Sequence, residues 1–67
     1  MVDQSGKEVT VGDRIVHFYI GGGISVMSRK GTIERVDMVS GKITVEWDDH
    51  YTGRSEIKKN FVRIDRE

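Results

Sequence analysis

Apolar residues recur along the chain in short groups, and glycine, aspartate or serine separates one group from the next. The clearest group is Ile43, Val45 and Trp47, which alternate with polar residues. A period of two is expected when one face of a β-strand packs against a core. We therefore predict a strand over residues 42–48, with Trp47 in the core.

The segment before this strand predicts a hairpin. Residues 31–36 supply the preceding strand, and Gly41 lies in the connection, where a positive φ is often required. Ile33 and Val36 are three residues apart, so they cannot share one face of a flat strand. We therefore expect a β-bulge at residues 34–35.

A further strand is predicted upstream, over residues 14–20. This stretch is rich in β-branched and aromatic residues and follows a turn signal at residues 11–13. Both of its faces are largely apolar: one carries Ile15, His17 and Tyr19, and the other carries Val16, Phe18 and Ile20. Alternation alone therefore leaves open which face points inward.

The last part of the chain predicts two more short strands, over residues 55–57 and 62–65, with one 3₁₀ turn at residues 58–61 between them. No window of a dozen residues keeps the apolar spacing of an amphipathic helix. Five short strands separated by turn signals predict an all-β fold. We expect a small five-stranded SH3-like barrel with a long loop, residues 21–30, after the first strand.

The length of 67 residues allows one core and therefore one domain, residues 1–67. We expect its core to span about residues 9–65 and both ends, residues 1–8 and 66–67, to be flexible. The chain has no cysteine, so neither disulfides nor thiolate metal sites stabilise it. Its stability must come from packing, and self-association stays open.

The charges of the chain balance, with 11 lysines and arginines against 11 aspartates and glutamates. Strong non-specific binding to DNA or to a membrane normally needs a basic excess. No run approaches the roughly 18 apolar residues that span a membrane. We expect a cytoplasmic location and no membrane partner.

Four motifs follow one another along the chain: Val-Gly-Asp-Arg-Ile at residues 11–15, Gly-x-Ile-x-x-Val at 31–36, Ile-x-Val-x-Trp-Asp-Asp at 43–49 and Val-x-Ile at 62–64. Their order resembles that of SH3-like barrels of the KOW and Tudor type. With His17 and the glycines at 21–23, the opening is similar to the Tudor-like C-terminal domains of UvrD-type helicases and to CarD-type RNA-polymerase-binding domains. The resemblance implies binding to proteins or nucleic acids and does not select between them.

The chain departs from that pattern at residues 24–30, where the helicase type turns almost directly into its second strand. An apolar strip with an adaptable methionine, followed by two basic residues, favours a contact surface for a protein partner. The candidate partner-binding residues are Gly21, Gly22, Gly23, Ile24, Val26, Met27, Arg29 and Lys30. Alternatively, Ile24 and Val26 fold back over an open end of the barrel, and the glycines form only a loop tip.

Nucleic-acid binding is the alternative function. Basic and aromatic residues that could form one face for phosphates and bases are Arg29, Lys30, Arg54, Lys58, Lys59, Tyr19 and Tyr51. Alternatively, these basic residues are only charges on solvated loops and bind nothing. For Trp47, a position in the core fits better than a position in a binding groove.

Catalytic and metal chemistry have little support in the sequence. Asp48-Asp49-His50 reads as a turn, and no nucleophile, base and orienting group form a recognisable frame. We predict a protein that is not an enzyme and has no cofactor and no metal. It is expected to bind another protein, such as a transcription or replication enzyme, through residues 21–30 and the adjacent edge strand. Assembly into an oligomer through a strand edge is a third hypothesis.

Overall fold

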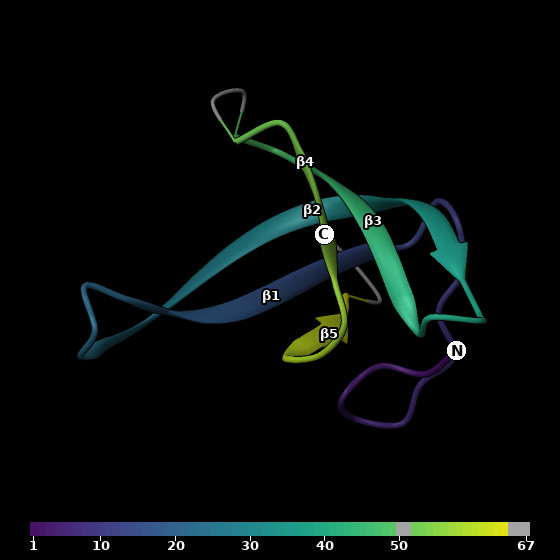
Figure 1. Ribbon diagram of the computed structural model, residues 1–67, viewed down its shortest axis with the longest axis horizontal. Coiled ribbons are helices and arrows are strands. Elements are labelled where there is room, and N and C mark those ends of the chain that lie inside the picture. The colour runs from purple at the N-terminus through teal and green to yellow at the C-terminus, as the bar shows by residue number, and fades with distance from the viewer. Residues whose placement is uncertain (50–51, 65–67) are drawn as a thin grey trace.

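The computed structural model describes residues 1–49 and 52–64 of the chain. Its strands are β1 (Arg14–Gly21), β2 (Ser25–Asp37), β3 (Lys42–Trp47), β4 (Arg54–Ile57) and β5 (Phe61–Arg63). They form one sheet in the order β4-β3-β2-β1-β5, and each neighbouring pair is antiparallel (Figure 1). The described residues contain no helix. The prediction of an all-β fold with five strands is confirmed.

One face of the curved sheet carries the core. Its buried apolar side chains come from β1, β2, β3, β4, β5 and the segment before β1: Val9, Ile15, Ile33, Ile43, Val45, Trp47, Ile57 and Phe61. Ile15 is fully buried, whereas Phe18 and Ile20 are exposed. The inward face of β1 is therefore the one that carries Ile15. The alternation of residues in the sequence did not decide between the two faces.

The expected β-bulge lies in β2. Ile33 pairs with Val45, but the next pair joins Arg35 to Thr44, so Glu34 has no direct partner in the register. The extra residue restores the inward direction for Val36, which packs against the core. This prediction is confirmed.

The predicted long loop at residues 21–30 is wrong. Residues 25–30 are part of β2 and pair with β1. The register is unbroken from the pair Gly21–Ser25 at the turn to the pair Arg14–Thr32 at the other end. Only residues 22–24 form the turn, in which Gly22 and Gly23 have φ of 64° and 81°. Pairing with β1 supplies the backbone hydrogen bonds of this segment, and the local sequence does not show that pairing.

Gly31 lies inside β2 instead of at its beginning. A Cβ atom there would lie 2.5 Å from Cγ1 of Val45 and 2.7 Å from the carbonyl oxygen of Glu46. The glycine therefore lets β3 and the core pack closely against β2.

Residues 59–60 form a bend, and the 3₁₀ turn predicted at residues 58–61 is absent. Asn60 has a φ of 65°, a left-handed conformation that asparagine tolerates better than most residues. Its carbonyl oxygen accepts a hydrogen bond from the N–H of Phe18 at 2.8 Å. The bend thus directs the chain into β5, which pairs with the first part of β1.

The first nine residues form a hydrogen-bonded loop beside β5. One carboxylate oxygen of Asp3 accepts bonds from Ser5 and from the N–H of Lys7, and the other accepts a 2.6 Å bond from the N–H of Arg63. Burial acts to raise the pKa of Asp3, but these hydrogen bonds outweigh it and lower the pKa to about 2. The carboxylate therefore joins this loop to the last strand.

Candidate interaction surface

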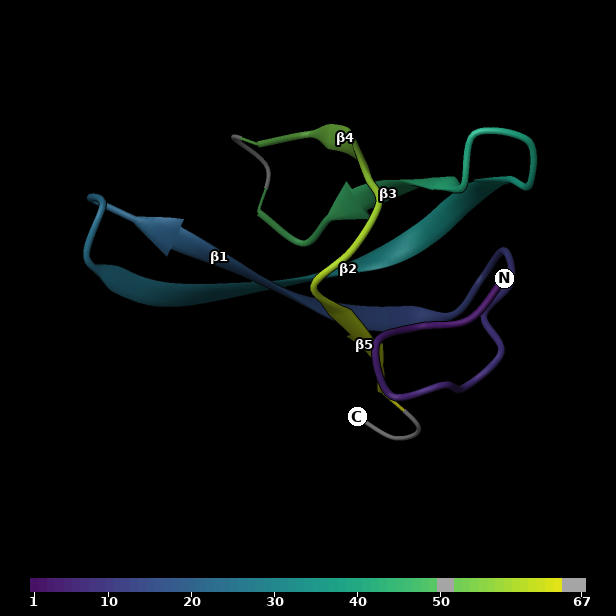
Figure 2. The ribbon, with the colours of Figure 1, turned by 60° about the horizontal axis from the view of Figure 1, so that its bottom comes forward.

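The most prominent surface feature is the outer part of the β1–β2 hairpin, residues 18–28, which we call the arm. β3 pairs with β2 only from Gly31 onward, and β5 pairs with β1 only from Ile15 to His17. The arm therefore projects past the other three strands, as both ribbon views show (Figures 1 and 2). Within the register of the sheet, its two strands pair only with each other.

The arm is apolar and carries no charge. No aspartate, glutamate, lysine or arginine occurs between residues 18 and 28. Its large exposed apolar side chains are Phe18, Ile20, Ile24, Val26 and Met27. Ile24 at the turn is 93% exposed, and Val26 is 71% exposed. Such a concentration of exposed apolar side chains is uncommon on a monomer, which makes the arm the candidate interaction surface.

One face of the arm is hollowed at its base. Ile20 and Val26 are direct cross-strand partners, and Phe18 lies on the same face two residues before Ile20. Together with Tyr19 and Asn60, these residues line a shallow groove of about 240 Å³. The groove lies where the arm meets the bend before β5, so this face combines an apolar strip with a recess.

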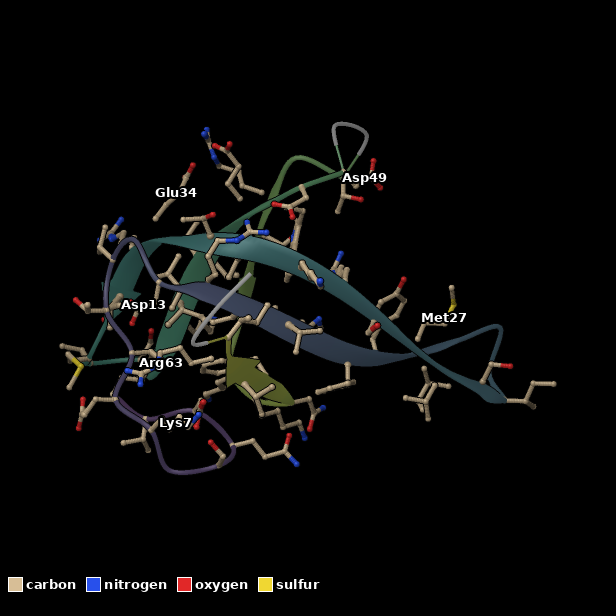
Figure 3. The ribbon with its side chains drawn as sticks, turned by 180° about the vertical axis from the view of Figure 1, so that it is seen from behind. Lys7, Asp13, Met27, Glu34, Asp49 and Arg63 are labelled. Atoms are coloured by element: carbon tan, nitrogen blue, oxygen red, sulfur yellow. The ribbon has the colours of Figure 1, made fainter. Side chains whose placement is uncertain are left out.

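The opposite face of the arm carries Met27. Its thioether lies across Gly21, where a Cβ atom would come within 2.1 Å of the sulfur. Figure 3 shows Met27 on the arm, far from Lys7 and Arg63 at the other end of the molecule. Gly21 thus makes room for an adaptable apolar side chain, whereas Gly22 and Gly23 form the turn.

The base of the arm is attached to the core by a cluster of aromatic rings and one arginine. The central carbon of the Arg29 guanidinium lies 3.9 Å from the ring centroid of Trp47 and 5.2 Å from that of Tyr19. His17 lies between these rings, with centroid distances of 6.0 Å to Tyr19 and 5.6 Å to Trp47. We call these four residues the arginine-aromatic cluster.

His17 is held neutral in this cluster. Burial lowers its pKa, and the positive charge of Arg29 lowers it further. Nε of Arg29 donates a hydrogen bond to Nδ1 of His17 at 3.4 Å, so Nδ1 is the unprotonated nitrogen. Protonation at Nδ1 would remove this bond and place two positive charges side by side.

Trp47 is a core residue, as predicted, with 4% of its surface exposed. Its Nε1 atom is buried and has no hydrogen-bond partner among residues 1–49 and 52–64. Sequence reasoning missed the cluster, because His17 and Arg29 are separated by 12 residues and meet only through the register of β1 and β2. A prediction that residues 14–32 form one long hairpin would have placed His17 opposite Arg29 and so indicated the cluster.

The candidate nucleic-acid-binding residues lie in different settings. Arg29 and Tyr19 belong to the arginine-aromatic cluster. Arg54 forms ion pairs with Glu34 at 2.9 Å and Glu46 at 3.2 Å, and both carboxylates raise its pKa. Carboxylates therefore surround this arginine, which weakens its attraction for phosphate.

The remaining basic candidates lie at two other places. Lys30 lies at the base of the arm, where its carbonyl oxygen accepts a hydrogen bond from the N–H of Asp48. Lys58 and Lys59 are exposed. They come directly after the last residue of β4, whereas Arg54 is its first residue. Tyr51 lies outside the described residues.

The described part of the chain holds no group of three histidine, aspartate or glutamate side chains that could bind a metal ion. The described residues also form no helix long and apolar enough to cross a membrane. Comparison with protein-family models, with curated proteins and with solved structures found no match for this chain.

Proposed function

We propose that this protein is a non-enzymatic binding module that docks on another protein through the arm. The observation that supports this function is the uncharged arm itself, which exposes Ile20, Ile24 and Val26 beyond the other strands. A two-stranded hairpin is at best marginally stable by itself in water. Contact with a partner would bury its apolar side chains and hydrogen-bond its free edges.

We further propose that the domain is an SH3-like barrel of the KOW and Tudor type. The strand order β4-β3-β2-β1-β5, with a bend before a short last strand, supports this assignment. The resemblance of the first motif to UvrD-type and CarD-type domains makes a transcription or replication enzyme the first class of partner to test.

A protein partner suits the arm better than a nucleic acid does. Binding to a phosphate backbone draws its affinity from lysine and arginine side chains. The arm has none, and Arg29 and Arg54 are engaged with aromatic rings and carboxylates. Apolar contact is consequently the main interaction that this surface offers.

The test is capture of partners from a lysate of the source cells, with wild-type protein and a Val26→Asp, Met27→Asp double variant. Val39→Asp is the matched control, because Val39 is 99% exposed and lies in the β2–β3 turn, outside the arm. We expect wild type and control to recover the same partner and the arm variant to lose it. Equal recovery by all three proteins would refute the arm as the docking site.

Nucleic-acid binding is tested in parallel by titrating labelled single-stranded and double-stranded oligonucleotides at low salt. We expect no binding at protein concentrations of about 100 μM, the weak end of the usual non-specific range. Binding that falls steeply with added salt would support the alternative function and contradict this proposal.

A further inference from the structure

Three neighbouring recesses lie at the base of the arm, and Asn60 lines all three. The first is the groove of about 240 Å³ between the arm and the bend. The second measures about 440 Å³ and is lined, besides Asn60, by two residues of the sheet and two of the N-terminal loop: Phe18, Val62, Gln4 and Ser5. The third measures about 300 Å³ and lies where residues 58–61 pass residues 2–4. We call these three the basal recesses.

An apolar row passes through the first two basal recesses, on the face of β1 that points away from the core. Val16 pairs directly with Val62, so Val62 lies on the same face as Phe18 and Ile20. At about 3.3 Å per residue, the row from Val16 to Ile20 is about 13 Å long. An extended segment with apolar side chains at alternate positions has the same spacing along its length.

Two lysines line the third basal recess. Lys58 and Lys59 are both exposed, and neither forms an ion pair within residues 1–49 and 52–64. Asp3 lines the same recess, but it is 5% exposed and its carboxylate is already bonded within the N-terminal loop and to β5. This end of the surface therefore attracts carboxylates of a partner.

Asn60 lies between the apolar row and the two lysines. Its backbone is fixed, because its carbonyl oxygen accepts the hydrogen bond from Phe18. Its left-handed φ suits glycine better, so asparagine at this position keeps an amide that the bend itself does not need. That amide is exposed and bonds to no described residue. It is therefore free to donate to and accept from the backbone of an extended segment.

We propose that the basal recesses bind an extended segment of a partner protein in which alternating apolar residues are followed by aspartate or glutamate. The inference rests on the proposed function, since it names the chemistry of the partner that docks on the arm. The apolar side chains pack along Ile20, Phe18 and Val62, and the carboxylates lie beside Lys58 and Lys59.

A nucleic acid suits the basal recesses less well than such a segment. Single strands bind through aromatic rings on which bases stack, together with cations along the backbone. Of the described aromatic residues that line the recesses, Phe61 is buried and Tyr19 is stacked on His17. Phe18 is left for stacking, and its neighbours Ile20 and Val62 are aliphatic.

Selection from a display library of random peptides of about ten residues tests the chemistry of the partner. The library is selected on wild type, on a Lys58→Glu, Lys59→Glu variant, which we call the lysine variant, and on a control. The control, Arg35→Glu with Lys42→Glu, carries the same change in charge at exposed positions of β2 and β3. We expect wild type and control to enrich peptides that combine alternating apolar residues with acidic ones. No enrichment on wild type, or an acidic preference that the lysine variant retains, would overturn the inference.

Titration of the most enriched peptide, with a fluorescent label, locates its binding site. We expect the lysine variant and Phe18→Ser each to bind about tenfold more weakly than wild type. Ile24→Ser should bind as wild type does, because Ile24 is at the turn and lines none of the basal recesses. Wild-type affinity in Phe18→Ser or in the lysine variant would overturn the inference.

Two other occupants give different results. Displacement of the peptide by an equal concentration of a single-stranded oligonucleotide would overturn the inference in favour of a nucleic acid. A wild-type dimer in sedimentation that the lysine variant dissolves would overturn it in favour of a second copy of the chain.

Capture from the lysate separates this inference from the proposed function. If the Val26→Asp, Met27→Asp variant loses the partner and the lysine variant keeps it, the proposed function stands and this inference fails. If both variants keep the partner, the arm itself fails as the docking site.

Discussion

The guanidinium of Arg29 lies over the indole ring of Trp47, with its central carbon 3.9 Å from the ring centroid. Trp47 belongs to the core. Arg29 lies in β2, two residues before Gly31, where the pairing of β2 with β3 begins. The contact therefore fastens the base of the arm to the body of the domain. It also occupies the arginine that would otherwise be a candidate for binding phosphate.

Removal of this contact should loosen the fold. Arg29→Ala is expected to lower the free energy of unfolding by about 1–2 kcal/mol, because a partly desolvated cation–π contact and its hydrogen bond to His17 are lost. Urea unfolding followed by the fluorescence of Trp47 measures the change. Arg35→Ala, at an exposed position of the same strand, is the control and should have little effect. Equal losses in the two variants would contradict the role of the cluster.

The lowered pKa of His17 predicts how stability depends on pH. The folded state binds a proton at His17 less readily than the unfolded state, whose pKa is near 6.5. The contribution of a neutral His17 is therefore complete above pH 6.5 and declines as the pH falls toward its lower folded pKa. Unfolding free energies of wild type and His17→Gln between pH 5 and 8 should converge as the pH falls. A constant difference over this range would refute the prediction.

Asp3 predicts a second, more acidic dependence. Its folded pKa of about 2 lies below the ordinary value of 3.8 for an aspartate, so its contribution to stability is present above pH 4 and is lost as the pH falls through 2. Asp3→Ala should lower the free energy of unfolding by about 1–2 kcal/mol at neutral pH, since it removes the bonds to Lys7 and Arg63. Chemical unfolding at pH 7 and at pH 2.5 measures both effects. Glu8→Gln, at an exposed carboxylate of the same loop, should leave the profile unchanged.

Two glycines of the hairpin predict unequal costs for the same substitution. Gly31→Ala would force a Cβ atom against Val45 and the backbone of Glu46, so we expect a loss of about 1–3 kcal/mol from overpacking. Gly21→Ala meets only the flexible side chain of Met27, which can move aside. Thermal unfolding of the two variants should therefore show the larger loss for Gly31→Ala. The opposite order would mean that the close contact of β2 with β3 is not a constraint.

The strand pattern could be read from the sequence because it depends on local alternation. Ile43, Val45 and Trp47 repeat with a period of two, and all three are buried on one face of β3. The bulge followed from the odd spacing of Ile33 and Val36. Such features need no knowledge of which strands are neighbours.

The arm could not be read in the same way. Ser25, Ser28 and the two basic residues after it weakened the strand signal, and Gly31 resembled the beginning of a strand. Only pairing with β1 makes residues 25–30 extended, because that partner supplies the hydrogen bonds. The sequence therefore indicated the residues of the exposed surface proposed for binding, but it predicted a loop where the structure has a β-hairpin.

The sequence by itself determined the all-β class, the five strands, the bulge and the buried place of Trp47, since each depends on the order of neighbouring residues. The tertiary structure decided the inward face of β1, the length of the hairpin and the position of Arg29 over Trp47. These depend on the register between strands, which brings together residues far apart in the chain, and a single sequence carries no direct signal for it.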